Sequence, residues 1–443
     1  MNARLARMLY FAAQRWRGEP VGAVLRALEQ SQGWSRERLL ALQWERQRAL
    51  FRHAFETVSW CRERWSALGL DSGSLRTPAD WTRIPVLTKP DVQAHGAAMR
   101  SARAPRGLTA ATSGSSGTPV AVLRSHLSWA HAHANVFRGW HWHGVDAGDP
   151  YAYFWGVPLD PEGRDLAARK DRFFNRVRCS AFDLSAEAAC ASYRRLRARP
   201  VRFAFGYPSA LAHFADEVAA QGLDGRALGW KVVVTSAEAL RPHQRERIAT
   251  TFGCPVADSY GCAEAGVAGF ECERLGMHVP VESVVVESVP VDGGLHEVLL
   301  TDLHNLSQPL LRYCVGDLVE PAEEGAACPC GRGLPLLGRL SGRAGDTLEL
   351  PGGRRINANQ PSYIFKKHGK SGAVREYQFV RFADRVELRV TAGPAWREAT
   401  AGEIRDEVAR ALGIAVEVRV VPRFERHGRG KHRDFVRAEE IGE

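Results

Sequence analysis

The chain has 443 residues, of which 45% are hydrophobic and 25% are charged, the balance of a soluble globular protein. This length predicts two or three domains with ample material for a core, and no apolar run approaches the ~18 residues of a membrane span. The formal net charge is +10, but the basic residues are nearly all arginine and are scattered among acids, which argues against nucleic acid as a partner.

Cysteine usage and the first residues bear on location. The nine cysteines are an odd number and suggest no disulfide framework, so we expect a reducing, cytoplasmic environment. Residues 1–17 carry Arg4 and Arg7 before an apolar patch that Gln14 and Arg15 interrupt, a pattern unlike a signal peptide. We interpret them as an ordinary surface helix and expect no membrane partner. A basic amphipathic helix lying on a partner or a membrane surface is the alternative.

Apolar spacing predicts the elements up to residue 300. Helices are expected at 35–68, which ends near Gly69, and at 126–144, with an extended segment at 84–89 between them. Further along, strands at 201–205 and 231–235 alternate with helices at 209–220 and 242–252. This alternation predicts a parallel α/β sheet. Two β-rich runs within 279–300 flank Asp292-Gly293-Gly294, a hairpin signal.

The pattern changes after residue 346. A second hairpin is expected around Pro351-Gly352-Gly353, followed by a strand at 386–390, a helix at 397–412 and a strand at 416–421. We therefore predict an α/β protein whose large N-terminal domain, residues 1–345, has mixed and parallel sheets flanked by helices. Residues 346–443 are predicted to form a small, mobile α+β C-terminal domain.

The segment Thr112-Ser113-Gly114-Ser115-Ser116-Gly117-Thr118-Pro119 is the first candidate for chemistry. Its glycines let backbone N–H groups approach an oxyanion, and its hydroxyls add donors, as in a phosphate cradle. Taken alone it is better read as a flexible linker, and a Walker loop would need a lysine where Thr118 stands. Three later segments follow it in order: Asp258-Ser259-Tyr260-Gly261-Cys262-Ala263-Glu264, Leu311-Arg312-Tyr313-Cys314-Val315-Gly316-Asp317 and Gly342-Arg343-Ala344-Gly345-Asp346.

In this order the four segments resemble the adenylate-forming ligase superfamily, and more closely its branch of phenylacetate-CoA ligase and capsule-biosynthesis (CapK-type) proteins. The resemblance extends over about residues 50–436. It implies ATP-dependent activation of a carboxylic acid to an acyl-adenylate with release of pyrophosphate, then transfer to CoA. A carrier-protein thiol or an amine are the alternative acceptors. An aryl or arylacetic acid is the first expectation, and residues 1–345 and 346–443 would be the adenylation and lid domains.

The resemblance also implies an ATP site. Residues Thr112, Ser113, Gly114, Ser115, Ser116, Gly117 and Thr118 would hold phosphates, and Ala237 and Glu238, after the strand at 231–235, would lie against adenine. Asp258, Ser259, Tyr260 and Gly261 would border the nucleotide, with Tyr260 stacked on the base. This segment brings an aromatic and two carboxylates within the length of two helical turns, and its Glu264 is a hard oxygen ligand suited to Mg²⁺.

Further roles follow from the same resemblance. Asp317 would accept hydrogen bonds from the ribose hydroxyls, Arg343 would reach the ribose or a phosphate, and Asp346 would be the hinge. Lys431, on a glycine-flanked loop, would bridge the attacking carboxylate and the α-phosphate, although such a tract is more commonly a solvated basic tail. Tyr207, Pro208 and Ser209 would line the acyl pocket. Val120 stands where many relatives have a lysine, so Arg124 is a candidate for neutralising phosphate charge.

A separate signal indicates a metal. Cys272, His278, Cys328 and Cys330 offer three thiolates and an imidazole, the ligand set of a closed tetrahedral Zn²⁺ site. Because four protein ligands leave no open position, we assign this zinc, within residues 272–330, to structure. Four histidines in the helix at 126–144 do not suggest a second metal, because residues two apart on a helix point in different directions: His131, His133, His141 and His143.

Two other classes of function remain open from the sequence. A zinc-bearing nucleic-acid binder would require clustered basic and aromatic residues, and a non-catalytic protein would bind nucleotide without turnover. The expected ligands are ATP, Mg²⁺, structural Zn²⁺, a small carboxylic acid and CoA or a carrier protein. A homodimer is a candidate assembly.

Overall fold

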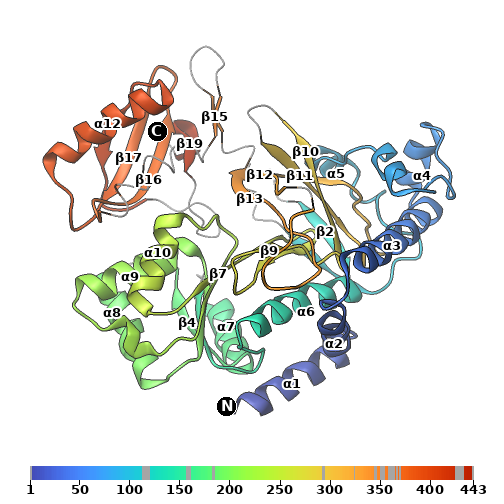
Figure 1. The fold of residues 1–443 in the computed structure, drawn as a ribbon, viewed down its shortest axis with the longest axis horizontal. Helices are drawn as coiled ribbons and strands as arrows, with labels where there is room; N and C mark the ends of the chain where they lie inside the picture. Colours follow the sequence, from blue (N-terminus) through green and yellow to red (C-terminus); the bar gives the residue numbers. More distant parts are fainter. Residues whose placement is uncertain are drawn as a thin grey trace. The chain divides into compact units, whose positions relative to one another are not determined.

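The computed structural model describes residues 2–111, 120–155, 161–181, 185–291, 295–323, 325–343, 347–349, 355–357, 365, 368, 371–424 and 434–441. The chain divides into two units (Figure 1). The first comprises Met1–Asp149, Phe173–Asn175 and Ala257–Arg339; the second comprises Pro150–Arg172, Arg176–Val256 and Leu340–Glu443. The α/β class is confirmed. A domain boundary at residues 345 and 346 stays a prediction.

Helices dominate the N-terminal part of the first unit. They are α1 (Ala3–Trp16), α2 (Val21–Ser31), α3 (Arg36–Thr57), α4 (Ser59–Ser66), the short 3-10 helix η1 (Pro78–Arg83), α5 (Lys89–His95) and α6 (His126–Trp142). The predicted helix at 35–68 is two helices, because the chain is extended at Val58. Serine side chains cap α3 and α6: Ser35 accepts from the Arg38 backbone N–H, and Ser125 accepts from that of Ser128.

Antiparallel strands complete the first unit. The pairs and ladders are β1 (Gly107–Ala111) with β2 (Ala121–Ser125); β7 (Val256–Cys262), β8 (Gly266–Glu271) and β9 (Met277–His278); and β10 (Val284–Pro290), β11 (His296–Asp302) and β12 (Tyr313–Glu320). The predicted hairpin is confirmed by the pairing of β10 with β11, and residues 292–294 lie outside the described residues. Buried residues of α3 and α4, Phe51 and Trp65 among them, pack against Val285, Leu303 and Leu311.

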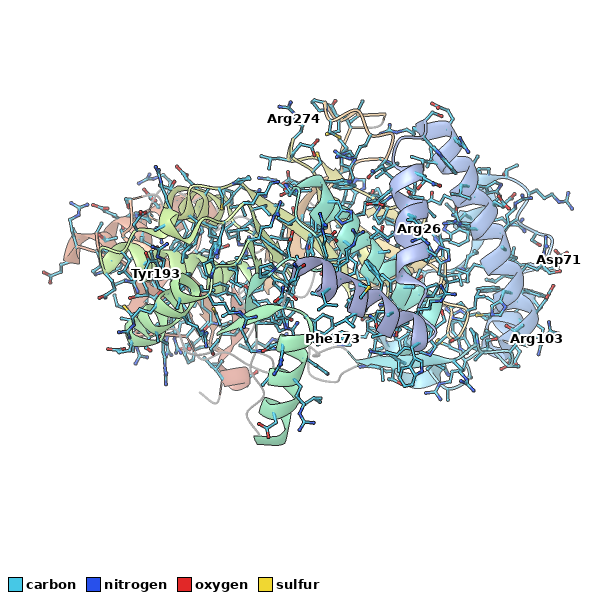
Figure 2. The ribbon with its side chains drawn as sticks, turned by 90° about the horizontal axis from the view of Figure 1, so that it is seen from below. Arg26, Asp71, Arg103, Phe173, Tyr193 and Arg274 are labelled. Carbon is cyan, nitrogen blue, oxygen red and sulfur yellow. The ribbon has the colours of Figure 1, made fainter. Side chains whose placement is uncertain are left out.

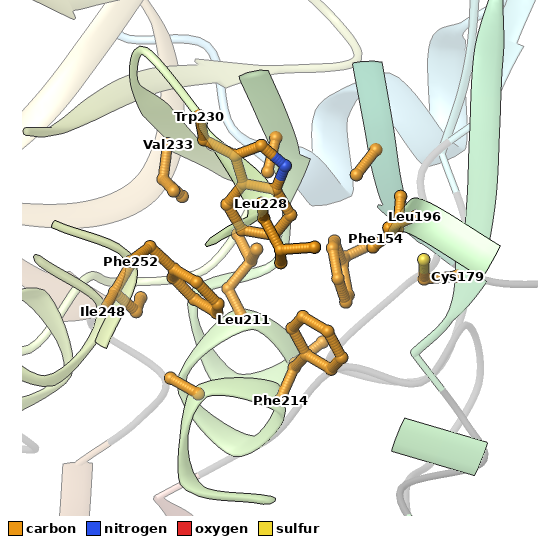
Figure 3. Packing of buried hydrophobic residues seen from close by; sticks show 14 of the residues in the cluster. Phe154, Cys179, Leu196, Leu211, Phe214, Leu228, Trp230, Val233, Ile248 and Phe252 are labelled. Carbon is orange, nitrogen blue, oxygen red and sulfur yellow. The ribbon is translucent and has the colours of Figure 1, made fainter. Parts of the chain in front are cut away.

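The second unit contains the predicted parallel sheet. Strands β3 (Tyr151–Trp155), β4 (Arg176–Ser180), β5 (Phe203–Gly206) and β6 (Val233–Ser236) run in the order β4-β3-β5-β6. The helices between and after them are α7 (Pro161–Phe173), α8 (Ala186–Ala198), α9 (Pro208–Ala220) and α10 (Pro242–Phe252), with η2 (Gly225–Leu228) before β6. Figure 3 shows the core of this part, where Phe214 and Trp230 each lie beside Phe252, with ring centroids 5.7 Å and 4.4 Å away.

The last residues form a sheet of their own. Its order is β18 (Glu417–Val420), β17 (Val386–Ala392), β16 (Val374–Arg381) and β19 (Phe435–Arg437), with α12 (Glu398–Leu412) and the 3-10 turn η4 (Ala438–Ile441). A separate hydrophobic cluster joins α12 to this sheet through Ile404 and Val408. Before it, β13 (Arg339–Arg343) precedes a short antiparallel pair, β14 (Thr347–Glu349) and β15 (Arg355–Asn357), which confirms the second predicted hairpin. Among the described helices, none has the length and apolarity to cross a membrane.

Candidate functional site

Tyr260 and Glu264 lie on a β-hairpin of the first unit. Asp258, Ser259, Tyr260 and Gly261 belong to β7, and Glu264 lies in the turn that leads to β8, so the segment is a strand and a turn rather than a helix. A Cβ on Gly261 would lie 2.2 Å from the Gly266 carbonyl oxygen, so only glycine allows the two strands to approach this closely. The hairpin therefore carries both side chains on a backbone whose path is fixed.

Two tyrosine–carboxylate hydrogen bonds join this hairpin to β12. The Tyr260 hydroxyl donates to Asp317 Oδ2 at 2.8 Å, and the Tyr313 hydroxyl donates to Glu264 Oε1 at 3.4 Å. Each segment thus supplies one tyrosine and one carboxylate, and the contact is reciprocal although the residues are about fifty positions apart in the sequence. The structure brings together three of the predicted site residues, Tyr260, Glu264 and Asp317.

Burial sets the protonation of the groups around Glu264. Burial, and next the Glu264 carboxylate, raise the pKa of the Tyr313 phenol, which keeps it a hydrogen-bond donor. Burial also raises the pKa of the Cys262 thiol well above its ordinary value, and Glu264 raises it further. A thiol held protonated in this way is a poor nucleophile, so we interpret Cys262 as a packing residue.

Arg124 contacts the turn between β7 and β8, and its side chain is buried, with 2% of its surface exposed. Its guanidinium pairs with Asp302 at 3.1 Å, and donates to Ser128 Oγ at 2.8 Å and to the Ala263 carbonyl at 3.2 Å. The charge of Arg124 is thus compensated by a buried carboxylate, and the suggestion that it neutralises phosphate charge stays a prediction. Arg124 also holds the residue before Glu264, a role that the sequence did not reveal.

Arg312 is a second contributor that sequence reasoning missed. Its backbone is left-handed, with φ of 52°, which is unusual for a residue with a side chain. Its guanidinium bonds Glu287 at 3.0 Å and the carbonyl of Ile84 at 2.6 Å. This conformation fixes the start of β12 immediately before Tyr313. No signal in a single sequence distinguishes such an arginine from a surface one.

In the second unit the predicted adenine turn follows β6. Ala237 has a positive φ of 71°, a conformation with a steric cost for alanine that is often found at functional turns. Glu238 Oε2 accepts from the Ser209 backbone N–H at 3.2 Å, so this turn and the start of α9 are joined. Tyr207 is buried against Trp155, with ring centroids 4.1 Å apart, and Pro208 begins α9. Assignment of Tyr207, Pro208 and Ser209 to an acyl pocket stays a prediction.

Several predicted residues lie outside the described part of the chain. They are the phosphate-loop residues Thr112, Ser113, Gly114, Ser115, Ser116, Gly117 and Thr118, the hinge residue Asp346 and the lysine Lys431. Arg343 is described only as the last residue of β13. Their roles stay predictions.

The four predicted metal ligands form a cluster in the first unit. One ligand atom from each of Cys272, His278, Cys328 and Cys330 lies within 4.8 Å of all the others. The Cys272 and Cys328 sulfurs are 3.6 Å apart, and His278 Nε2 lies 3.1 Å from Cys330 Sγ. A tetrahedral zinc ion with bonds of about 2.0–2.3 Å separates its ligands by roughly 3.5 Å, so the cluster fits this ion.

The surroundings of the cluster favour metal ligation as well. His278 Nδ1 lies 3.0 Å from the Leu334 carbonyl, which fixes the tautomer with Nε2 directed at the sulfurs. The Arg274 backbone N–H donates to Cys272 Sγ at 3.3 Å. A Cβ on Gly276 would lie 2.7 Å from Cys328 Sγ, so a glycine is required beside the cluster. Cys272 and His278 are buried, which agrees with a structural rather than a catalytic site.

The four histidines of α6 and its C-terminal cap do not converge, as expected from their spacing. His131 contacts Ser283, His133 contacts Tyr10 and Gln14, His141 contacts Glu29 and Asp146, and His143 contacts the Glu271 carbonyl. Among the described residues, the cysteine–histidine cluster is the one group placed to share a metal ion.

Comparisons with known proteins bear on the family. No protein-family model matches the chain. The chain is 25% identical over 431 residues to phenylacetate-coenzyme A ligase of Aromatoleum evansii, covering 90% of this chain and 93% of that protein. It is 23% identical over 257 residues to Protein CapK of Staphylococcus aureus, covering 57% of each.

A solved structure gives the fold. The chain matches 2-hydroxyisobutyryl-CoA ligase, crystallised in the postadenylation state with 2-HIB-AMP, with a TM-score of 0.71 and 23% identity over 91% of this chain and 90% of that one. The resemblance inferred from the four ordered motifs is thereby confirmed. By its curated relatives, the chain resembles the branch of adenylate-forming ligases that contains phenylacetate-CoA ligase and CapK, and its fold is that of the solved acyl-CoA ligase.

Proposed function

We propose that the protein is an AMP-forming acid–CoA ligase. It would activate a carboxylic acid with ATP as an acyl-adenylate, release pyrophosphate, and transfer the acyl group to CoA. The observation that carries this proposal is the reciprocal contact of Tyr260 with Asp317 and of Tyr313 with Glu264. It gathers two of the four motifs into one site with the aromatic and carboxylate groups that a magnesium nucleotide requires.

Each residue of this site is proposed to have a separate role. A carboxylate accepts several hydrogen bonds, so Asp317 can accept from ribose hydroxyls while it holds the Tyr260 hydroxyl. Tyr313 holds Glu264 in one orientation, in which its carboxylate would hold Mg²⁺. The bound ion would compensate the charge of the departing pyrophosphate. Lys431 would stabilise the crowded charge as the substrate carboxylate meets the α-phosphate.

An aryl or arylacetic acid is the proposed substrate, supported by the likeness to phenylacetate-coenzyme A ligase. CoA is the proposed acceptor on the same ground. The half-buried rings of Tyr153, Trp155 and Phe205, with centroids 5.5–6.0 Å apart on neighbouring strands of the second unit, supply aromatic surface for such a substrate. Transfer to a carrier-protein thiol or an amine would use the same adenylate.

We also propose that Cys272, His278, Cys328 and Cys330 hold a structural Zn²⁺ ion. The ion would tie the segment after β8 to the segment after β12, two elements that carry the proposed site. Four protein ligands and burial leave no place for substrate at the ion, so its contribution is to folding.

The test is ATP–pyrophosphate exchange with a panel of aryl, arylacetic and short aliphatic acids, followed by CoA-dependent AMP release with each positive acid. We expect exchange with an aromatic acid and its loss in Lys431→Ala and Glu264→Gln. Lys170→Ala, at an exposed position of α7, is the matched control. No exchange with any acid, although calorimetry shows ATP binding, would replace the proposal with a non-catalytic nucleotide binder.

A further inference from the structure

Helix α1 has a buried face, which packs against the described part of the protein, and an apolar face that is exposed. Ala6, Tyr10 and Gln14, four residues apart, form the buried face. Tyr10 packs edge-on against Phe137 of α6 with ring centroids 5.2 Å apart, and the Gln14 side chain donates to the Tyr10 hydroxyl at 2.9 Å. An ion pair at 3.2 Å between Arg7 and Asp146 adds to this attachment. The helix is therefore fixed, and its other face points away from α6.

The opposite face is apolar and exposed. Leu5, Met8, Leu9 and Trp16 have 44%, 61%, 41% and 90% of their surface exposed. Their spacing of three, four and seven residues puts them on one side of the helix, together with the small, exposed Ala12. Figure 2 shows α1 from below along its length, beside α2, which carries the labelled Arg26. A contiguous exposed apolar stripe of this kind marks a site of protein or membrane interaction more often than a single exposed residue does.

All the charged residues of α1 are basic. The helix contains Arg4, Arg7 and Arg15 and no aspartate or glutamate. Arg7 is paired with Asp146, whereas Arg4 and Arg15 are exposed and flank the apolar stripe on its Met8 side. A second copy of the chain would place like charges opposite one another with no acid on either helix to compensate them. A surface with anionic phosphates above an apolar layer matches both the stripe and its arginines.

We propose that α1 is an interfacial helix that docks the protein onto anionic lipid bilayers. Leu5, Met8, Leu9 and Trp16 enter the boundary between head groups and acyl chains, and Arg4 and Arg15 bind lipid phosphates. Tryptophan is suited to this boundary because its ring is apolar and its N–H is polar. This proposal takes up the alternative of a basic amphipathic helix lying on a membrane surface, and it does not depend on the proposed ligase activity.

Vesicle flotation of the full chain tests the proposal. We expect the protein to float with vesicles of phosphatidylcholine and phosphatidylglycerol, to remain unbound with pure phosphatidylcholine, and to be released by 0.5 M salt. Leu9→Glu and Trp16→Glu should abolish flotation. Arg4→Ala combined with Arg15→Ala should weaken binding to the vesicles about 25-fold, because each arginine near an anionic surface contributes roughly a factor of five.

Leu68→Glu is the matched control, since Leu68 is 55% exposed in the same unit and lies outside α1. It should float like the unchanged protein. Circular dichroism melts show that each variant is folded, and sedimentation equilibrium follows assembly in parallel. Absence of flotation, flotation that Trp16→Glu leaves intact, or a dimer that Trp16→Glu dissociates would each overturn the proposal, the last by assigning the stripe to a second copy of the chain.

Discussion

Replacing Arg124 by methionine tests whether the ion pair beneath the Glu264 hairpin supports both stability and the proposed site. Arg124 and Asp302 are 2% and 7% exposed and lie 3.1 Å apart. Methionine fills much of the same volume but removes the charge and leaves Asp302 buried without its cation. Breaking a buried ion pair from one side costs about 3–5 kcal/mol. Asp302 keeps the His304 backbone N–H at 2.9 Å and a short bond from Ser128, so we expect the lower part of that range.

The assay is urea unfolding followed by circular dichroism, with Arg83→Met as the control. Arg83 and Asp80 form an ion pair at 3.5 Å near the surface, so its loss should lower the free energy of unfolding far less than loss of the buried Arg124–Asp302 pair. Adding Asp302→Asn to Arg124→Met should recover part of the loss, because the uncompensated charge is then removed. In the ligase assay, Arg124→Met should raise the Mg²⁺ concentration needed for half-maximal rate, since the Ala263 carbonyl beside Glu264 loses its donor.

This prediction is contradicted if Arg124→Met lowers the free energy of unfolding by less than about 1 kcal/mol, or if the double variant is no more stable than Arg124→Met alone. Either result would mean that water or a rearranged side chain compensates Asp302. A loss of stability without any change in Mg²⁺ dependence would separate the two roles and leave Arg124 a purely structural residue.

Three further predictions concern other parts of the fold. Gly139→Ala should destabilise the protein by about 1–3 kcal/mol, because its Cβ would lie 2.4 Å from the Phe270 ring. Gly402→Ala in α12, where a Cβ meets only the Arg405 side chain at 3.8 Å, should stabilise it by about 0.5–1 kcal/mol. Thermal melts should therefore show a lower melting temperature for the first variant and a higher one for the second. Burial lowers the pKa of both His131 and His304, which are stacked with centroids 3.4 Å apart, so unfolding takes up protons and the free energy of unfolding should fall as the pH drops below about 6.5. Replacing His131 by asparagine should flatten this dependence, and an unchanged slope would contradict it. Purified protein should contain one zinc per chain by mass spectrometry, and Cys328→Ser should remove the metal and lower the melting temperature, whereas Cys190→Ser, at a position outside the cluster, should do neither.

Elements with local signals at both ends were predictable from the sequence. Helix α10 begins at Pro242 and ends before Gly253, which takes the left-handed conformation, and the predicted range matches it. The metal cluster was also predictable from a local signal, because the closely spaced Cys328 and Cys330 are a pattern typical of metal ligands. The break at Val58 carried no glycine or proline, and the structure alone revealed it.

Contacts between distant residues limited the prediction of the site. The tyrosines and carboxylates were recognised as motifs, but their reciprocal pairing depends on how β7 faces β12, which no local pattern encodes. The Arg124–Asp302 pair joins residues 178 positions apart, and each looks like an ordinary surface residue in the sequence. The spacing around Tyr260 suggested helical turns because glycine and alanine conceal the alternation of a strand.

The first unit is assembled from segments that lie far apart in the sequence, and this has a consequence for synthesis on the ribosome. Phe51 and Trp65 are made early, whereas Val285, Leu303 and Leu311, which cover them, belong to the segment that emerges after residue 256. Strands β3 to β6 and the helices between them are complete by then, so we expect this inserted sheet to fold first. Nascent chains stalled at that length should expose the apolar sides of α3 and α4 and be held by chaperones until translation resumes.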